Sequence, residues 1–102
     1  MNPFDLSGRV AIITGGSRGI GLAIADGLAS AGAIAVIANR STQQGKEAAE
    51  KIRKKGLKAK AVPVDVTQRK SVEALVTQTL KEFGHIDILV NSAAVIVRKP
   101  IV

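Results

Sequence analysis

Four short apolar runs alternate with three longer segments of helical periodicity along this chain of 102 residues. The apolar runs, which predict β-strands, cover residues 9–14, 34–39, 58–64 and 86–91. Each intervening segment is long enough to cross a sheet and return to a parallel strand. This order predicts a single α/β domain over residues 1–102, built as a doubly wound parallel sheet with helices on both faces.

The composition of the runs predicts where each strand lies in the sheet. The first, second and fourth runs are almost continuously apolar, as in strands that are buried on both faces. Pro63 stands near the end of the third run. Because proline cannot donate a hydrogen bond to a central ladder, we expect the third strand at an edge of the sheet.

The helical segments carry apolar residues at steps of three and four. In the first segment these are Ile20, Ile24, Leu28 and Ala31, which make one apolar stripe of the kind that faces a core, and in the third they are Val72, Leu75, Val76, Leu80 and Phe83, which share one such face. The second segment spans residues 42–55 and follows Ser41, whose spacing to Gln44 is that of a capping box. A glycine, which commonly ends a helix, follows each segment at Gly32, Gly56 and Gly84.

The charge balance bears on the class of partner. Fifteen Lys and Arg against eight Asp and Glu give a formal net charge of +7. Much of the excess lies in residues 51–60, where cations complement the dipole at a helix end. Phe4 and Phe83 are the only Phe, Trp or Tyr residues, which leaves no platform for stacked bases. The sequence favours a solvated basic face over a nucleic-acid patch.

Targeting features are not evident in the sequence. Cysteine is absent, which removes disulfides and thiolate metal sites and suits a reducing compartment. No apolar run reaches the length of about 18 residues that crosses a bilayer, and the first residues do not resemble a signal peptide. We expect a cytoplasmic protein with no membrane partner and no metal site.

The stretch TGGSRGIG, from Thr14 to Gly21, places glycines between a predicted strand and a predicted helix. Backbone N–H groups at a helix N-terminus form an anion site, and glycines let a pyrophosphate approach because they carry no Cβ. Gly15, Gly19 and Gly21 have the spacing G-x-x-x-G-x-G, which differs from the phosphate loop G-x-x-x-x-G-K-[ST]. The pattern favours a dinucleotide phosphate site; the alternative is a tight turn with a close contact between helix and strand.

This stretch resembles the signature T-G-x-x-x-G-x-G of the short-chain dehydrogenase/reductase family, and the resemblance covers essentially the whole chain. It implies a Rossmann-like half domain with strand order 3-2-1-4 that binds a nicotinamide dinucleotide. The loop residues that the resemblance assigns to the cofactor are Gly15, Ser17, Arg18, Gly19, Ile20 and Gly21. Within the family, the chain shows a fainter resemblance to gluconate 5-dehydrogenases and 3-oxoacyl-carrier-protein reductases.

The residues after the second predicted strand favour NADP(H) over NAD(H). A carboxylate there would accept hydrogen bonds from ribose hydroxyls and repel a 2′-phosphate, and this chain has Asn39 instead. Arg40 follows, and its guanidinium can hold a phosphate with two hydrogen bonds. Arg18, in the glycine loop, can reach the same region. We therefore expect NADPH to bind more tightly than NADH.

Two further segments match the family. Asp65 and Val66 stand where the resemblance implies recognition of the adenine edge, by a carboxylate and by the next backbone N–H. The alternative is that Asp65 is a turn or capping residue beside Thr67. In the fourth predicted strand, Asn91 and Ala93 match the family motif N-N-A-G and complete the expected cofactor-binding set.

The remaining candidates carry weaker signals. Ser92 and Ala94 depart from the N-N-A-G motif, and Ala94 adds a Cβ where the backbone would run beside the cofactor. His85, the only histidine, shows no acidic or metal-binding companion, so we expect an exposed loop residue. The tail with Arg98 and Lys99 resembles family members that act on gluconate or related sugar acids, and the alternative is that these cations are ordinary loop residues.

The family reduces carbonyls with a tyrosine as proton donor, and this sequence contains no tyrosine. We therefore assign no catalytic residue and expect only the cofactor-binding half of a longer oxidoreductase that transfers hydride between NADPH and a small carbonyl or alcohol. This chain alone should be inactive. The alternatives are a non-catalytic dinucleotide-binding module and a self-associating fragment. Because the fourth strand would lie at an edge of the sheet, we expect a homo-oligomer formed through that edge or through exposed helix faces.

Overall fold

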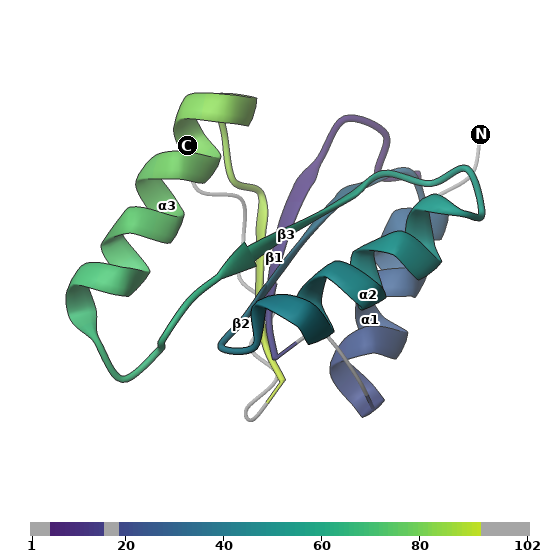
Figure 1. Ribbon diagram of the computed structural model, residues 1–102. Helices are drawn as coiled ribbons and strands as arrows, with labels where there is room; N and C mark the ends of the chain where they lie inside the picture. Colours follow the sequence, from purple (N-terminus) through teal and green to yellow (C-terminus); the bar gives the residue numbers. More distant parts are fainter. Residues whose placement is uncertain (1–4, 16–18, 93–102) are drawn as a thin grey trace.

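The computed structural model describes residues 5–15 and 19–92. Their elements, in chain order, are β1 (Val10–Thr14), α1 (Gly19–Ser30), β2 (Ile34–Asn39), α2 (Thr42–Arg53), β3 (Ala59–Pro63), α3 (Arg69–Phe83) and β4 (Ile88–Asn91). The sheet has the order β3-β2-β1-β4 and every pairing is parallel. Helices α1 and α2 cover one face and α3 covers the other (Figure 1). The predicted fold class and strand order are confirmed.

Strand β3 lies at one edge of the sheet, as Pro63 predicts. The amide of Ala35 donates to the carbonyl of Lys58 over 3.1 Å, and the amide of Val64 donates to the carbonyl of Asn39 over 3.0 Å. Because alternate residues of a strand turn their backbone groups to the same side, residues 58, 60, 62 and 64 bond to β2. Pro63 falls between them, where an N–H would face away from β2, so its missing donor removes no ladder bond.

The two faces of the sheet carry separate apolar cores, which explains the continuous apolar runs. Under α1 and α2, Ala11 and Ile13 of β1 pack with the buried residues of β2 and the two helices, including Ile37 and Ile52. Under α3, the alternate residues Val10 and Ile12 pack with a second set of buried side chains. Both sides of β1 and β2 are therefore excluded from water.

Helix α1 buries a different stripe from the predicted one. Its buried residues are Gly21, Ala25 and Ala29, whereas the side chain of Ile20 is 70% exposed. Ile24 and Leu28 flank the buried stripe and are half-buried. The small residues let the helix backbone lie close to the sheet, so the larger side chains are displaced to either side. The expectation that Ile20 faces the core is wrong.

Helix α3 also departs from its predicted face. Leu75 is buried, and so is Thr79, whose hydroxyl donates to the carbonyl of Leu75 over 2.7 Å. Val76 and Leu80, predicted to face the core, are 38% and 44% exposed. In the described part of the chain, a single helix covers this face of the sheet, so one side of α3 has no neighbour to pack against.

The predicted start of α2 and the predicted end of α3 are confirmed, whereas α2 ends at Arg53 rather than at residue 55. The Ser41 side chain accepts a hydrogen bond from the amide of Gln44 over 3.2 Å at the start of α2. Gly84 ends α3 with a left-handed backbone (φ 85°), and its amide donates to the carbonyl of Leu80. None of the described helices has the length and apolar character needed to cross a membrane.

Candidate functional site

The carboxyl ends of β1, β2 and β3 open onto a common pocket of about 200 Å³. It is lined by Gly15, Ala38, Asn39, Arg40, Val64, Asp65, Val66 and Thr67. Five of these residues belong to the predicted cofactor set: Gly15, Asn39, Arg40, Asp65 and Val66. Because strands of a parallel sheet all end at the same side, turns that are far apart in sequence meet here.

The first glycine of the loop has a structural cause of its own. Gly15 has φ +72°, and a Cβ on it would lie 2.3 Å from Oγ of Ser92, which follows β4. A tight turn and a close approach therefore require glycine at this position, in agreement with the alternative weighed for the loop. Ser17 and Arg18, two other predicted loop residues, lie outside the described residues.

Gly19 differs from Gly15 in its surroundings. It begins α1 with φ +61°, and nothing lies within 4 Å of the position that a Cβ would take. The first N–H groups of α1 have no partner within the helix, and its first turn has no acidic residue. The start of α1 lies at the edge of the sheet where the strands end, but Gly19 lines a separate hollow of about 470 Å³ between α1 and α2 rather than the 200 Å³ pocket. Gly21 is buried on the side of α1 that faces the sheet.

Asn39 and Arg40 end β2 in different environments. A Cβ on Gly45 would lie 2.6 Å from Oδ1 of Asn39, so the Asn39 side chain rests against the first turns of α2. The Arg40 side chain is 84% exposed and reaches toward β3, with Nη2 lying 3.9 Å from Oδ2 of Asp65. The guanidinium is therefore available at the mouth of the pocket.

Asp65 is held by the turn that follows β3. Its Oδ1 accepts hydrogen bonds from the hydroxyl and the amide of Thr67, over 2.6 and 3.0 Å, while its own amide donates to Oγ of Ser71 over 2.9 Å. The hydrogen bond from the Thr67 hydroxyl, and next the one from the Thr67 amide, hold the pKa of Asp65 below its ordinary value. The positive charge of Arg40 lowers this pKa further. Asp65 therefore acts as a turn residue through Oδ1, while its Oδ2 lies near the Arg40 guanidinium.

Two of the predicted residues expose apolar side chains: Val66, which lines the pocket, and Ile20, in the first turn of α1. Ile20 is 70% exposed and Val66 is 62% exposed, the two highest values among large apolar residues in the described ranges. Single exposed apolar residues are common, but here both belong to the set predicted from the sequence.

Asn91 lies at the end of β4 and does not line the 200 Å³ pocket. It lines a neighbouring hollow of about 230 Å³ between α3 and the sheet, which also includes Val66, Leu75 and Val76. The two hollows meet at Val64 and Val66. Ala93, the other residue predicted from this segment, lies outside the described residues.

The residues present fit a dinucleotide. Gly19 leaves a space that a Cβ would otherwise enter, and α1 supplies backbone donors beside it. Arg40 offers a cation, and Asp65 offers carboxylate oxygens at the neighbouring turn. Phosphate donors, a cation and exposed apolar side chains thus share one edge of the sheet.

His85 has an acidic neighbour that the sequence analysis missed. Its Nε2 lies 3.1 Å from Oδ2 of Asp87 and 2.9 Å from the carbonyl oxygen of Gly8. The signal was present in the sequence, since Asp87 follows His85 by two residues. These residues lie before β1 and β4, at the end of the sheet opposite the pocket. Among the described residues, no group of three or more His, Cys, Asp or Glu could hold a metal ion.

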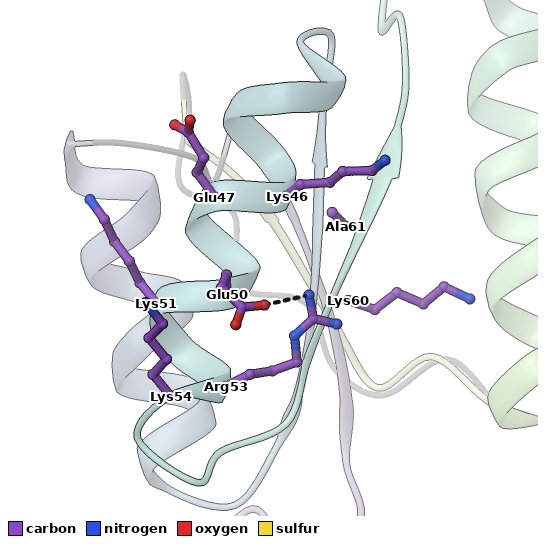
Figure 2. Close-up of a pocket in the computed structure, with 8 residues that line it drawn as sticks. All are labelled: Lys46, Glu47, Glu50, Lys51, Arg53, Lys54, Lys60 and Ala61. Atoms are coloured by element: carbon purple, nitrogen blue, oxygen red, sulfur yellow. Dashed lines mark hydrogen bonds and ion pairs between the residues drawn. The ribbon is translucent and has the colours of Figure 1, made fainter.

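A larger hollow of about 720 Å³ lies along α2 and β3 and contains none of the predicted residues. Figure 2 shows that Lys46 and Lys60 extend to one side and that Glu47 and Lys51 extend away from them, while Glu50 and Arg53 pair with each other. Lys60 forms an ion pair with Glu82 of α3. The hollow is a charged groove on the outside of the sheet, without a focus for one ligand.

The sequence matches known proteins over almost all of its length. Residues 9–102 match the profile of the short chain dehydrogenase family. An uncharacterized oxidoreductase of Thermotoga maritima is 43% identical over 96 residues, which are 94% of this chain and 38% of that protein. The 5-keto-D-gluconate 5-reductase of Escherichia coli strain K12 is 37% identical over 97 residues, with coverages of 95% and 38%.

Solved structures agree with these matches. The crystal structure of a metagenomic short-chain oxidoreductase in complex with NADP superposes with a TM-score of 0.81 at 36% identity, covering 83% of this chain and 38% of that one. The chain spans about 38% of the length of the curated relatives it matches. The fold, the glycine loop and the match over residues 9–102 place this chain in the short-chain dehydrogenase family.

Proposed function

We propose that this chain forms the cofactor-binding portion of an NADP(H)-dependent oxidoreductase that transfers hydride between NADPH and a small carbonyl or alcohol. The observation that supports it most directly is the pocket shared by the ends of β1, β2 and β3, which gathers Gly15, Asn39, Arg40, Asp65 and Val66. Membership of an oxidoreductase family gives the pocket its chemical context.

The preference for NADP(H) rests on charge at the end of β2. Asn39 contributes no carboxylate there, and the exposed guanidinium of Arg40 can form two hydrogen bonds with a 2′-phosphate. A structural relative bound to NADP gives independent support. The amides at the start of α1 would hold the pyrophosphate, and the bound cofactor would supply the hydride.

Isothermal titration calorimetry of this chain with NADPH and NADH tests the proposal. We expect a lower Kd for NADPH, and we expect Arg40→Asp to reverse the preference because a carboxylate accepts ribose hydroxyls and repels phosphate. Lys58→Asp is the matched control because Lys58 is exposed and does not line the pocket. The Lys58→Asp substitution changes the net charge by the same amount as Arg40→Asp. Equal affinities for the two cofactors would contradict the preference, and binding of neither would contradict the site.

The chemistry is proposed for a protein longer than this chain. The family's proton donor is a tyrosine, and none occurs in the 102 residues. We expect no oxidation of NADPH when the chain is incubated with a panel of small ketones, even where calorimetry shows binding. Turnover by this chain would require a different proton donor and would contradict this part of the proposal.

Self-association is a second candidate, favoured by exposed apolar surface. Within the described residues β4 is an edge strand whose Ile88 and Leu89 are only half-buried, and Val76 and Leu80 are exposed on α3 nearby. Two copies could pair β4 edges or pack these faces together. Sedimentation velocity of the wild-type chain should show a dimer or larger species. The Leu80→Lys substitution should shift the distribution toward the monomer. A monomer over the whole concentration range would reject this candidate.

A further inference from the structure

The mouth of the cofactor pocket holds a negative charge that the residues of β2 do not supply. Strand β2 ends in Asn39, which is neutral, yet Oδ2 of Asp65 lies 3.9 Å from Nη2 of Arg40. Asp65 follows β3, the neighbouring strand. A carboxylate from the turn after the neighbouring strand therefore lies beside Arg40 at this mouth.

The two partners differ in how firmly they are held. Asp65 is fixed by hydrogen bonds from the amide and hydroxyl of Thr67 to Oδ1 and by the bond from its own amide to Ser71. Arg40 extends into solvent, with 84% of its side chain exposed against 29% for Asp65. A guanidinium near a fixed carboxylate can turn toward an incoming phosphate, whereas the carboxylate stays in place.

The charge of Asp65 persists at neutral pH. The bonds from Thr67 hold its pKa below the ordinary value of 3.8, so the group remains ionised throughout the range in which dinucleotide binding is measured. A fixed negative charge beside Arg40 would oppose a 2′-phosphate in two ways: it competes for the guanidinium, and it repels the phosphate directly. A ribose hydroxyl is neutral and would experience neither effect.

We propose that Asp65 is a specificity-determining residue. Its carboxylate partly offsets the positive charge of Arg40 and thereby reduces the preference of the pocket for NADPH over NADH. This inference rests on the proposed function of the pocket. The site then carries opposing charges from two turns: Arg40 attracts the 2′-phosphate and Asp65 limits that attraction.

Calorimetric Kd values for NADPH and NADH, measured for the wild-type chain and Asp65→Asn, test this. The ratio of the two Kd values isolates the 2′-phosphate, because any contact of residue 65 with the adenine is common to both ligands. Asn retains an oxygen that can accept the bonds from Thr67. We expect Asp65→Asn to increase the preference for NADPH by about two- to fivefold at low ionic strength, and the gain should shrink as salt is added.

Two variants serve as controls. Asp65→Glu keeps the charge and should leave the ratio near the wild-type value. Glu73→Gln removes one negative charge from α3, away from the pocket, and should also leave it unchanged. An unchanged or reduced preference in Asp65→Asn, with measurable binding, would overturn the inference; a reduction would mean that the carboxylate orients Arg40 for phosphate. Failure of the wild-type chain to bind either dinucleotide would instead reject the proposed function and this inference with it.

Discussion

Oδ2 of Asp87 accepts a hydrogen bond from the amide of Val10 over 2.8 Å, so a side chain provides the acceptor for the first residue of β1. Oδ1 of the same carboxylate lies 3.3 Å from Nη1 of Arg9, and Oδ2 lies 3.1 Å from Nε2 of His85. Asp87 is only 7% exposed. The carboxylate therefore joins the start of β1 to the segment before β4.

Replacement of Asp87 should destabilise the fold in proportion to the hydrogen bonding that is lost. Asp87→Ala leaves the buried amide of Val10 without an acceptor, and we expect the free energy of unfolding to fall by about 1–3 kcal/mol. Asp87→Asn keeps an acceptor oxygen and should cost less. Urea denaturation of the two variants measures the difference. Equal losses would show that charge, rather than the bond to Val10, is what matters.

Two helical glycines should respond to alanine with opposite signs. Gly27 is exposed on α1 with nothing within 4 Å of a Cβ, so Gly27→Ala should stabilise the protein by about 0.5–1 kcal/mol. Gly45 is buried in α2, and its Cβ would lie 2.6 Å from Oδ1 of Asn39. We expect Gly45→Ala to destabilise by about 1–3 kcal/mol. Thermal unfolding measures the change in Tm for each variant. A change of the same sign in Gly27→Ala and Gly45→Ala would contradict this prediction.

Removal of the Thr67 hydroxyl should raise the pKa of Asp65. The hydroxyl is the largest cause of the lowered value, and the amide of Thr67 remains in Thr67→Val, so we expect a partial return toward 3.8. A carboxyl whose pKa is lower in the folded state contributes stability above about pH 3.8, which is lost as pH falls through the folded value. That contribution should be smaller in the variant.

Carboxyl carbon NMR titration measures the Asp65 pKa directly. Thr77→Val, on the exposed side of α3, is the matched control and should leave the titration unchanged. A titration of Asp65 that is identical in Thr67→Val and the wild-type chain would show that the hydroxyl does not lower the pKa.

Truncation of two leucines on α3 should separate its packed side from its open side. Leu75 is 3% exposed, and Leu75→Ala should lower the free energy of unfolding by about 2–3 kcal/mol. Leu80 is 44% exposed, and Leu80→Ala should cost about 1 kcal/mol or less. Denaturation at low protein concentration avoids any contribution from self-association. Comparable losses would mean that the exposed side of α3 is covered in solution.

The architecture could be predicted because its strongest signals are local. Burial on both faces makes β1 and β2 continuously apolar, and caps such as Ser41 and Gly84 mark helix ends within a few residues. The buried side of α1 could not be read in the same way. Periodicity gives most weight to large residues such as Ile20, whereas close packing against the sheet selects Gly21 and Ala25.

Five of the twelve residues predicted for the cofactor line the pocket, but the charge arrangement at its mouth was not predicted. Arg40 and Asp65 follow different strands, and only the parallel sheet brings their side chains to 3.9 Å. The sequence left a cofactor role and a turn role open for Asp65, and the bonds from Thr67 show that the turn role is present. The partners of His85 were missed because a lone histidine was weighed without its near neighbour Asp87.

The uneven cover of the sheet has a consequence for how the molecule opens. Among the described elements, two helices lie over one face and α3 alone lies over the other, and the ion pair between Lys60 and Glu82 connects α3 to β3 at the edge of the sheet. Amide hydrogen exchange should therefore proceed in at least two cooperative stages, with α3 detaching before β1 and β2 lose their protection. Rising ionic strength, which weakens this ion pair, should lower the free energy of the first stage while leaving the second nearly constant.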